Sequence, residues 1–298
     1  MDISRRLMLG TSLGMAALAA VAPGSATAAT PETFTARSRD GLALSGQAWG
    51  DPGHPEILLI HGLGQSRLSW ELQVAALADR FRIVAYDLRG HGDSDKPDDA
   101  AVYGDGTLWG DDIQAVRAAA GLRRPVLVGW SLGGLAIGHY LARHGDEAIA
   151  GVNLVAAVTR LSPELLTPTS RDHAGLLASS DLAMRIAAIE RFLAACFARP
   201  PAAEAFRRML VFNGMVPRGV QQGIVRIGSD GLDQAFGRVD RMLVTYGALD
   251  ALTAPEMSRR VLDLNPRARL SLYEGVGHTP FYEDPGRFNA ELAAFAAG

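Results

Sequence analysis

Residues 125–145 join a short apolar run to a helical segment through Gly129-Trp130-Ser131-Leu132-Gly133. A G-x-S-x-G pattern in this context is typical of a turn so sharp that its central residue is held in a strained conformation. The small residues let the neighbouring backbone approach, and the turn exposes the Ser131 hydroxyl above the edge of the sheet. The helix that begins there favours negative charge at its N-terminus. The stretch therefore predicts an α/β sheet that carries a serine nucleophile.

Short apolar runs alternate with segments of helical periodicity along most of the chain. Trp70, Val74 and Leu77 recur at i, i+4 and i+7, as on the apolar face of a helix. An Asp-Gly pair at 40–41 indicates a hairpin between two N-terminal strands. The predicted strands are 34–39, 42–49, 56–60, 81–86, 125–130, 149–155, 242–246 and 268–273. This order predicts an α/β fold with a mostly parallel central sheet covered by helices on both faces.

Residues 160–238 interrupt the alternation, because they contain no convincing strand. Segments 176–199 and 201–215 instead predict helices rich in Ala, Leu, Met and Phe. We expect a helical cap, inserted late in the sheet, that closes over the site. The alternative is that these helices only lengthen the fold.

Two domains follow from this division of the chain. The α/β core is predicted to comprise residues 29–159 and 239–298, and the helical cap residues 160–238. The cap is rich in large apolar side chains, of which Met184, Phe192 and Phe212 are candidates for the wall of a substrate pocket.

A nucleophilic serine requires a base, and the base requires an acid that orients it. His278 follows the last predicted strand by five residues, and Asp250 follows the preceding strand by four. Asp240 precedes its strand and would lie at the wrong edge of the sheet. Ser131, His278 and Asp250 are therefore predicted to be the nucleophile, the base and the orienting acid.

Acyl transfer also needs two amide donors for the oxyanion of its tetrahedral intermediate. One is predicted to be the backbone N–H of Leu132, directly after the nucleophile. The other is predicted to be the N–H of Leu63, in the loop "HGLG" after a predicted strand. Trp130 is predicted to line the pocket wall, with packing behind the turn as the alternative.

Four short motifs lie in order along the chain: "HGLG" at 61–64, "YDLRGHGDS" at 86–94, "GWSLGG" at 129–134 and "GVGHTPF" at 275–281. On these motifs, residues 33–297 resemble the α/β-hydrolase superfamily. "HYLARHG" and "RFNAELAAF" are similar to cofactor-free bacterial chloroperoxidases (perhydrolases) and related esterases, and "RFRIVAYDLRGHG" is similar to enol-lactonases and meta-cleavage product hydrolases. The serine at 131 departs from haloalkane dehalogenases and epoxide hydrolases, which carry an aspartate there.

The resemblance implies a serine hydrolase that cleaves a small to medium hydrophobic carboxylic ester or lactone through an acyl-enzyme. The alternatives are perhydrolysis on the same triad, hydrolysis of a carbon–carbon bond, and a non-catalytic ligand receptor. A small-molecule substrate is expected, with no cofactor and no metal. His61 and His91 belong to the loop motifs and are expected to hold backbone geometry.

The first 28 residues differ in composition from the rest. A basic start is followed by an apolar run at 7–22 and by Ala26-Thr27-Ala28, a small-residue cleavage site. Ser4-Arg5-Arg6 resembles a twin-arginine signal, and an ordinary secretion signal is the alternative. Either predicts a bacterial protein that is exported, periplasmic or secreted, and has no membrane segment in its mature form.

The charge and the cysteine content limit the partners and the chemistry. A formal net charge of −3 argues against a nucleic-acid partner, which requires a basic face. The one cysteine, Cys196, has apolar neighbours at helical spacing and is predicted to fill the core.

Overall fold

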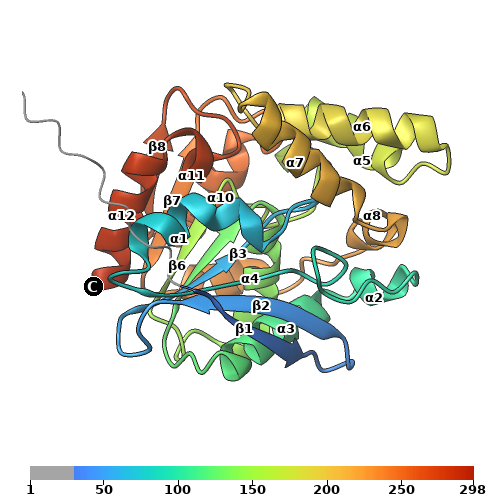
Figure 1. The fold of residues 1–298 in the computed structure, drawn as a ribbon. Helices are drawn as coiled ribbons and strands as arrows, with labels where there is room; N and C mark the ends of the chain where they lie inside the picture. Colours follow the sequence, from blue (N-terminus) through green and yellow to red (C-terminus); the bar gives the residue numbers. More distant parts are fainter. Residues whose placement is uncertain (1–29) are drawn as a thin grey trace, which may run out of the picture.

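The computed structural model describes residues 30–298, so the predicted export signal at 1–28 lies outside the described residues. An eight-stranded sheet forms its centre, in the order β1-β2-β4-β3-β5-β6-β7-β8 (Figure 1). The β1–β2 and β2–β4 pairs are antiparallel and the other neighbours are parallel. The predicted fold class is therefore confirmed. The strands are β1 (Glu32–Arg37), β2 (Ala43–Trp49), β3 (Glu56–Ile60), β4 (Arg82–Tyr86), β5 (Val126–Trp130), β6 (Gly151–Val155), β7 (Met242–Gly247) and β8 (Arg269–Tyr273).

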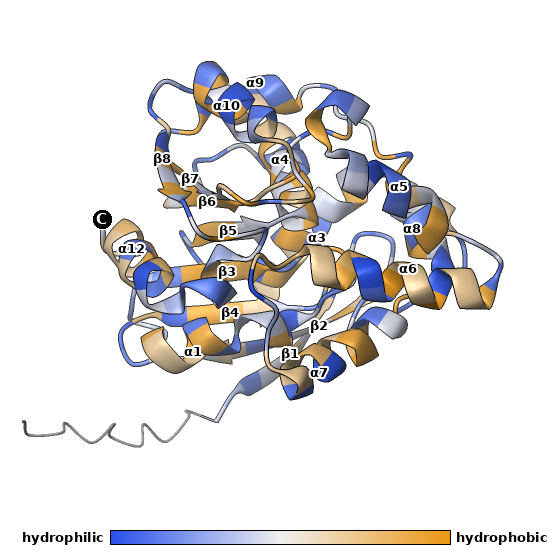
Figure 2. Cartoon of the chain, turned by 90° about the horizontal axis from the view of Figure 1, so that it is seen from above, coloured by the Kyte–Doolittle hydropathy of each residue, from blue (hydrophilic) through white to orange (hydrophobic). Residues whose placement is uncertain are grey.

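Helices cover both faces of this sheet. In β3, Ile57 and Leu59 pack with one set of helices, and Leu58 and Ile60 pack with the other, because successive side chains of a strand point to opposite faces. The central strands are accordingly mostly hydrophobic, whereas the outer helices mix hydrophobic and hydrophilic residues (Figure 2). One set is α1 (Glu71–Leu77), α11 (Pro280–Glu283) and α12 (Pro285–Ala297), and the other is α3 (Gly106–Ala119), α4 (Leu132–His144), α9 (Leu232–Arg238) and α10 (Pro255–Leu264).

The parallel part of the sheet positions the site. Strands β3, β5, β7 and β8 run in one direction, so the loops that follow them leave the sheet at the same edge. Ligands of open α/β sheets bind beyond the carboxyl ends of the strands. The four loops contain the predicted oxyanion, nucleophile, acid and base residues, respectively.

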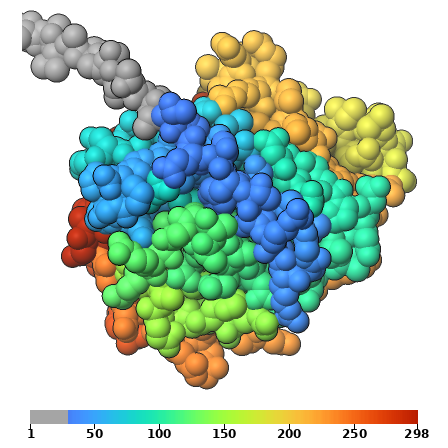
Figure 3. Space-filling model, turned by 60° about the horizontal axis from the view of Figure 1, so that its bottom comes forward, coloured from blue at the N-terminus to red at the C-terminus, as the bar shows by residue number. Residues whose placement is uncertain are grey.

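Helices α5 to α8 stand away from the sheet at this edge, where they form the upper right of Figure 1 and project beyond the body in Figure 3. The helix predicted over 176–199 is interrupted: the carboxylate of Asp181 accepts a hydrogen bond from the N–H of Met184 at 2.9 Å and starts a new helix. These helices are α5 (Pro168–Leu177), α6 (Leu182–Ala195), α7 (Ala203–Gly214) and α8 (Arg218–Ile224).

The remaining helices are short. Helix α9 falls inside the predicted cap segment, but Leu232 and Phe236 bury it against the core beside α4. The remaining pieces are α2 (Ala101–Gly104), η1 (Arg67–Trp70) and η2 (Pro163–Leu165). Within residues 30–298, no helix combines the length and the apolar character that crossing a bilayer requires.

Candidate active site

Ser131 lies at the sharp turn between β5 and α4. Its backbone has φ 52° and ψ −117°, a conformation that a residue with a Cβ adopts at a cost of about 1–3 kcal/mol. Hydrogen bonds hold it there: its N–H donates to the carbonyl of Val155 at 3.0 Å, and its carbonyl accepts from Gly134 and Val158 at 2.9 Å each. A Cβ at Gly133 would lie 2.6 Å from the carbonyl oxygen of Ile60. The glycine is therefore required for the turn to pack on β3.

His278 and Asp250 meet at the ends of neighbouring loops. The Nδ1 of His278 lies 2.8 Å from Oδ2 of Asp250, and both side chains are buried. The other oxygen of Asp250 accepts the N–H groups of Leu252 and Thr253 at 2.8 and 3.0 Å, and the Thr253 hydroxyl donates to Oδ2 at 2.5 Å. Because a carboxylate only accepts, Nδ1 carries the proton and Nε2 of the neutral ring is the acceptor.

The backbone of His278 is held from two sides. Its N–H donates to the carbonyl of Cys196 at 3.0 Å, and its carbonyl accepts the indole Nε1–H of Trp130 at 2.9 Å. The ring of Trp130 packs 4.8 Å from that of Phe281, behind the histidine. Trp130 is not among the residues that line the cavity beside Ser131; it packs behind the turn, which is the alternative stated for it.

Two buried histidines shape the loop that carries Leu63. Nε2 of His61 accepts the N–H of Leu88 at 3.0 Å, and Nε2 of His91 accepts the N–H of Gly64 at 3.1 Å. Burial lowers the pKa of His61 to about 4 and that of His91 to about 3, so both rings stay neutral and can accept. Both histidines therefore fix backbone, as the sequence predicts.

The predicted oxyanion donors have free amides. Among the described residues, neither the N–H of Leu63 nor that of Leu132 has a hydrogen-bond partner. Leu132 is the first residue of α4, whose opening N–H groups have no carbonyl one turn earlier to bind. Both leucines line the same cavity as Ser131 and His278. Such unpaired amides can bind an oxyanion that forms beside the serine.

The cavity has a volume of about 120 Å³ and is roofed by cap helices. Of the three cap residues predicted for the pocket, Phe192 lines this cavity, and Met184 and Phe212 do not. Met184 is 49% exposed on the outer side of α6, and Phe212 of α7 lines a separate cavity that α7 forms with η1 and α1. The structure thus places both side chains away from the cavity of Ser131. The lining is Leu63, Ser131, Leu132, Val158, Leu161, Leu166, Ser170, Ala174, Leu177, Phe192, Gln221, Ile224, Val225, Leu252, Thr253 and His278.

A sequence profile described as the alpha/beta hydrolase fold matches residues 55–285. The chain belongs to this family. The solved structure of a candidate aryl esterase from Burkholderia cenocepacia is 38% identical to it, with a TM-score of 0.85, and the match covers 89% of this chain and 98% of that one. An esterase from Rhodococcus sp. ECU1013 is 31% identical, with a TM-score of 0.83 and the same two coverages. A non-heme haloperoxidase from Rhodococcus erythropolis is 29% identical over 278 residues, 86% of this chain and 96% of that protein.

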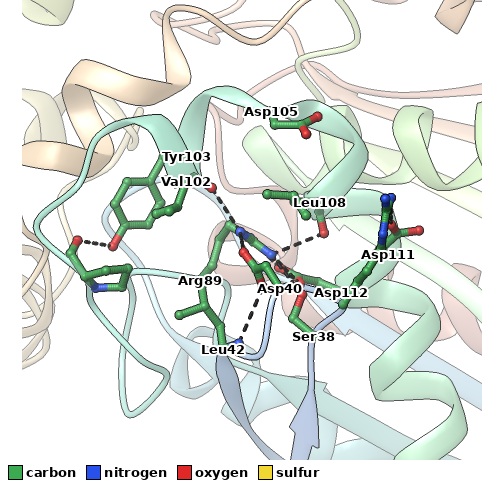
Figure 4. Close-up of polar contacts among 12 residues, drawn as sticks. Ser38, Asp40, Leu42, Arg89, Val102, Tyr103, Asp105, Leu108, Asp111 and Asp112 are labelled. Carbon is green, nitrogen blue, oxygen red and sulfur yellow. Dashed lines mark hydrogen bonds and ion pairs between the residues drawn. The ribbon is translucent and has the colours of Figure 1, made fainter.

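Arg89 of this α/β-hydrolase has a structural role that the sequence analysis did not assign (Figure 4). Its buried guanidinium binds both oxygens of Asp112 at 2.7 Å, and it also donates to Asp40 and to the carbonyl of Val102 at 2.9 Å. Burial disfavours the charge, but these partners outweigh burial and raise the pKa of Arg89 above its ordinary value. An arginine three residues after a buried strand, with two adjacent acids on the long helix that follows, is the signal that could have predicted this ion pair.

Cys196 is buried, and burial raises the pKa of its thiol well above the ordinary value. It packs in the cap with Phe192 and Leu177. An apolar site of this kind suits a neutral thiol that fills space, and the reactive form of cysteine is the thiolate. Its carbonyl, which binds the N–H of His278, is the part that touches the site.

Proposed function

We propose that this α/β-hydrolase cleaves small to medium hydrophobic carboxylic esters or lactones through an acyl-enzyme. One observation carries the proposal. Nδ1 of His278 is engaged by Asp250, whereas Nε2 is buried without a hydrogen-bond partner among the described residues, and the ring lines the same cavity as Ser131. A base that is oriented on one side and free on the other is what activation of a serine requires.

The chemistry follows from these positions. Oγ of Ser131 attacks the carbonyl carbon while its proton passes to Nε2 of His278. The carbonyl oxygen becomes an oxyanion, which the N–H groups of Leu63 and Leu132 bind. Collapse of this intermediate breaks the bond to the alkoxy oxygen, which takes the proton from His278 and leaves as the alcohol. Water then attacks the acyl group with His278 as the base, and the acid departs as Ser131 regains its proton.

The cavity sets the substrate class. Its volume of about 120 Å³ is close to that of a cavity of roughly 150 Å³ that holds benzene, so a short acyl chain or one ring fits. Apart from Ser131 and His278, the polar lining consists of Ser170, Gln221 and Thr253, and none of the described lining residues is Asp, Glu, Lys or Arg. Binding gains roughly 25 cal/mol per Å² of apolar area, which favours hydrophobic groups over charged acids or sugars.

A series of p-nitrophenyl esters from acetyl to dodecanoyl tests the proposal. We expect kcat/KM to peak at short or intermediate chains, and Ser131→Ala to lower turnover by a factor on the order of 10³ or more. A fluorophosphonate should label Ser131 alone. Labelling of another residue would remove Ser131 as the nucleophile, and a monotonic rise to dodecanoyl would contradict the closed cavity.

Perhydrolysis is the second candidate, because a haloperoxidase is among the relatives that match most of the chain. Peroxide would replace water at the acyl-enzyme of Ser131 and release a peracid, which oxidises bromide. The same esters with peroxide and bromide separate the two activities. Bromination above the level of Ser131→Ala would support perhydrolysis, and an equal level would exclude it.

We also propose that residues 1–28 direct export and are removed, and that α5 to α8 act as the cap over the site. Fractionation and N-terminal sequencing of the natural protein test the cleavage. Replacing Arg5 and Arg6 by lysine should retain the protein in the cytoplasm if the route is twin-arginine, whereas the general secretion route would tolerate the change.

A further inference from the structure

Glu283 holds the loop on both sides of His278. Its Oε1 accepts the N–H of Gly277 at 2.9 Å and the hydroxyl of Thr279 at 3.1 Å. These two residues directly precede and follow the histidine in the chain. The N–H of Glu283 in turn donates to the carbonyl of Thr279 at 2.9 Å, which closes the loop on itself.

The second oxygen of the same carboxylate binds the segment after helix α6 of the cap. Oε2 of Glu283 accepts the N–H groups of Ala198 and Arg199 at 3.0 Å each, in the segment that follows the end of helix α6 at Ala195. The guanidinium of Arg199 also donates to the carbonyl of Glu283 at 3.1 Å. Two residues earlier, the carbonyl of Cys196 accepts the N–H of His278. One carboxylate thus joins the loop of the histidine to the segment that ends the cap helix.

We propose that Glu283 is a positioning residue, which sets the place of His278 by fastening its loop and the end of α6 to one carboxylate. This inference rests on the proposed function, in which His278 is the base. Phe192 lies one turn before the end of α6 and lines the cavity. The carboxylate of Glu283 therefore fixes His278 relative to the wall of the pocket.

Binding both segments requires a side chain of this length with two acceptor oxygens. Four donors from two segments converge on the carboxylate of Glu283, two on each oxygen. Glutamine has the same length but one acceptor oxygen, so it can serve one pair of donors and leaves the other opposite its own N–H₂ group. Alanine serves neither pair. The two substitutions therefore loosen the loop of His278 to different degrees.

The experiment compares Glu283→Ala and Glu283→Gln with Glu274→Ala in the full-length mature protein. Glu274 is exposed in the same loop, and its side chain has no hydrogen-bond partner among the described residues, so it is a matched control. Turnover of p-nitrophenyl butyrate is divided by the active-site concentration, titrated from the burst of p-nitrophenol. The rate of fluorophosphonate labelling of Ser131 and the melting temperature are measured alongside.

We expect Glu283→Ala to lower kcat per titrated site by roughly 10- to 100-fold, as a small misplacement of a reacting group does, with KM changed less than about threefold. Glu283→Gln should lie between this variant and the wild type, and Glu274→Ala should match the wild type. The labelling rate should fall in parallel, because it needs the same base.

Two results would overturn the proposal. One is a kcat per titrated site within twofold of the wild type, with only the melting temperature lowered, which would make Glu283 merely structural. The other is a rise in KM at constant kcat. If Glu283→Ala does not fold, Glu283→Gln decides by the same criteria. If the wild type cleaves no ester, the proposed function fails, and the labelling rate still tests Glu283.

Discussion

Asp250→Asn tests the triad most sharply, because the contacts of Asp250 dictate how the amide must lie. One carboxylate oxygen accepts two backbone N–H groups, from Leu252 and Thr253, and these donors cannot turn round. The single carbonyl oxygen of an asparagine must therefore stay with them. Its N–H₂ group then faces Nδ1 of His278, now 2.8 Å from the carboxylate.

The substitution reverses the tautomer of the histidine. Nδ1 of His278 becomes an acceptor, so the ring proton moves to Nε2, where it blocks uptake of the proton from Ser131. Loss of the orienting carboxylate from a serine triad costs about 10⁴ in kcat, and four decades correspond to about 5.4 kcal/mol of activation free energy. KM should change little, because Asp250 does not line the cavity.

The assay is steady-state hydrolysis of p-nitrophenyl butyrate by Asp250→Asn, with Asp240→Asn as the control. The side chain of Asp240 is 85% exposed before β7, 3.7 Å from Arg267, and its amide variant should keep full activity. Circular dichroism verifies that both variants are folded. A loss of less than tenfold in Asp250→Asn, or equal losses in the two variants, would refute the assignment of the acid.

Three further outcomes follow from the packing. Phe192→Ala should move the best ester to a longer acyl chain by enlarging the cavity, whereas Met184→Ala on the outer side of the same helix should leave the chain-length profile unchanged. Arg89→Leu should lower the free energy of unfolding in urea by about 3–5 kcal/mol, since it leaves Asp112 buried without its cation. The pKa of His91 in the folded protein is about 3, below its unfolded value of about 6.5. Its neutral ring therefore contributes stability that is complete above pH 6.5 and that falls by about 1.4 kcal/mol per pH unit as the pH drops toward 3. Urea titrations of the wild type and His91→Gln at pH 5 and 7 measure this loss.

The fold and the proximity of Asp250 to His278 could be predicted because both depend on short motifs and on the order of strands along the chain. The turn at Ser131 needs glycines within two residues, and parallel strands bring the loops with Asp250 and His278 to one edge, whatever fills the core. Family membership followed from the same short motifs and is confirmed by the match over residues 55–285. The roles of the triad residues stay predictions until the variants are measured.

The cap could not be predicted in the same detail, because its helices have apolar residues on more than one side. Helix α6 buries Ala188 and Phe192 but exposes Leu182, Met184 and Ile186. A helix that is apolar all round gives no periodic signal for the face it buries. Phe192 turns inward because it packs with Leu177 of the preceding helix and with Leu252, which lies about 60 residues further along the chain and cannot be paired with it from local periodicity.

The fold fixes every polar group of His278 except the one that the proposed reaction uses. Its N–H, its carbonyl and its Nδ1 are bound by Cys196, Trp130 and Asp250, which come from the cap, the end of β5 and the loop after β7. Nε2 alone is buried without a partner within the described residues. The ring lines the cavity that Ser131 also lines, so Nε2 is the nitrogen available to accept the proton of Ser131 in the proposed reaction. The three hydrogen bonds hold the ring in one orientation, in which Nδ1 faces Asp250 and Nε2 is left for the serine.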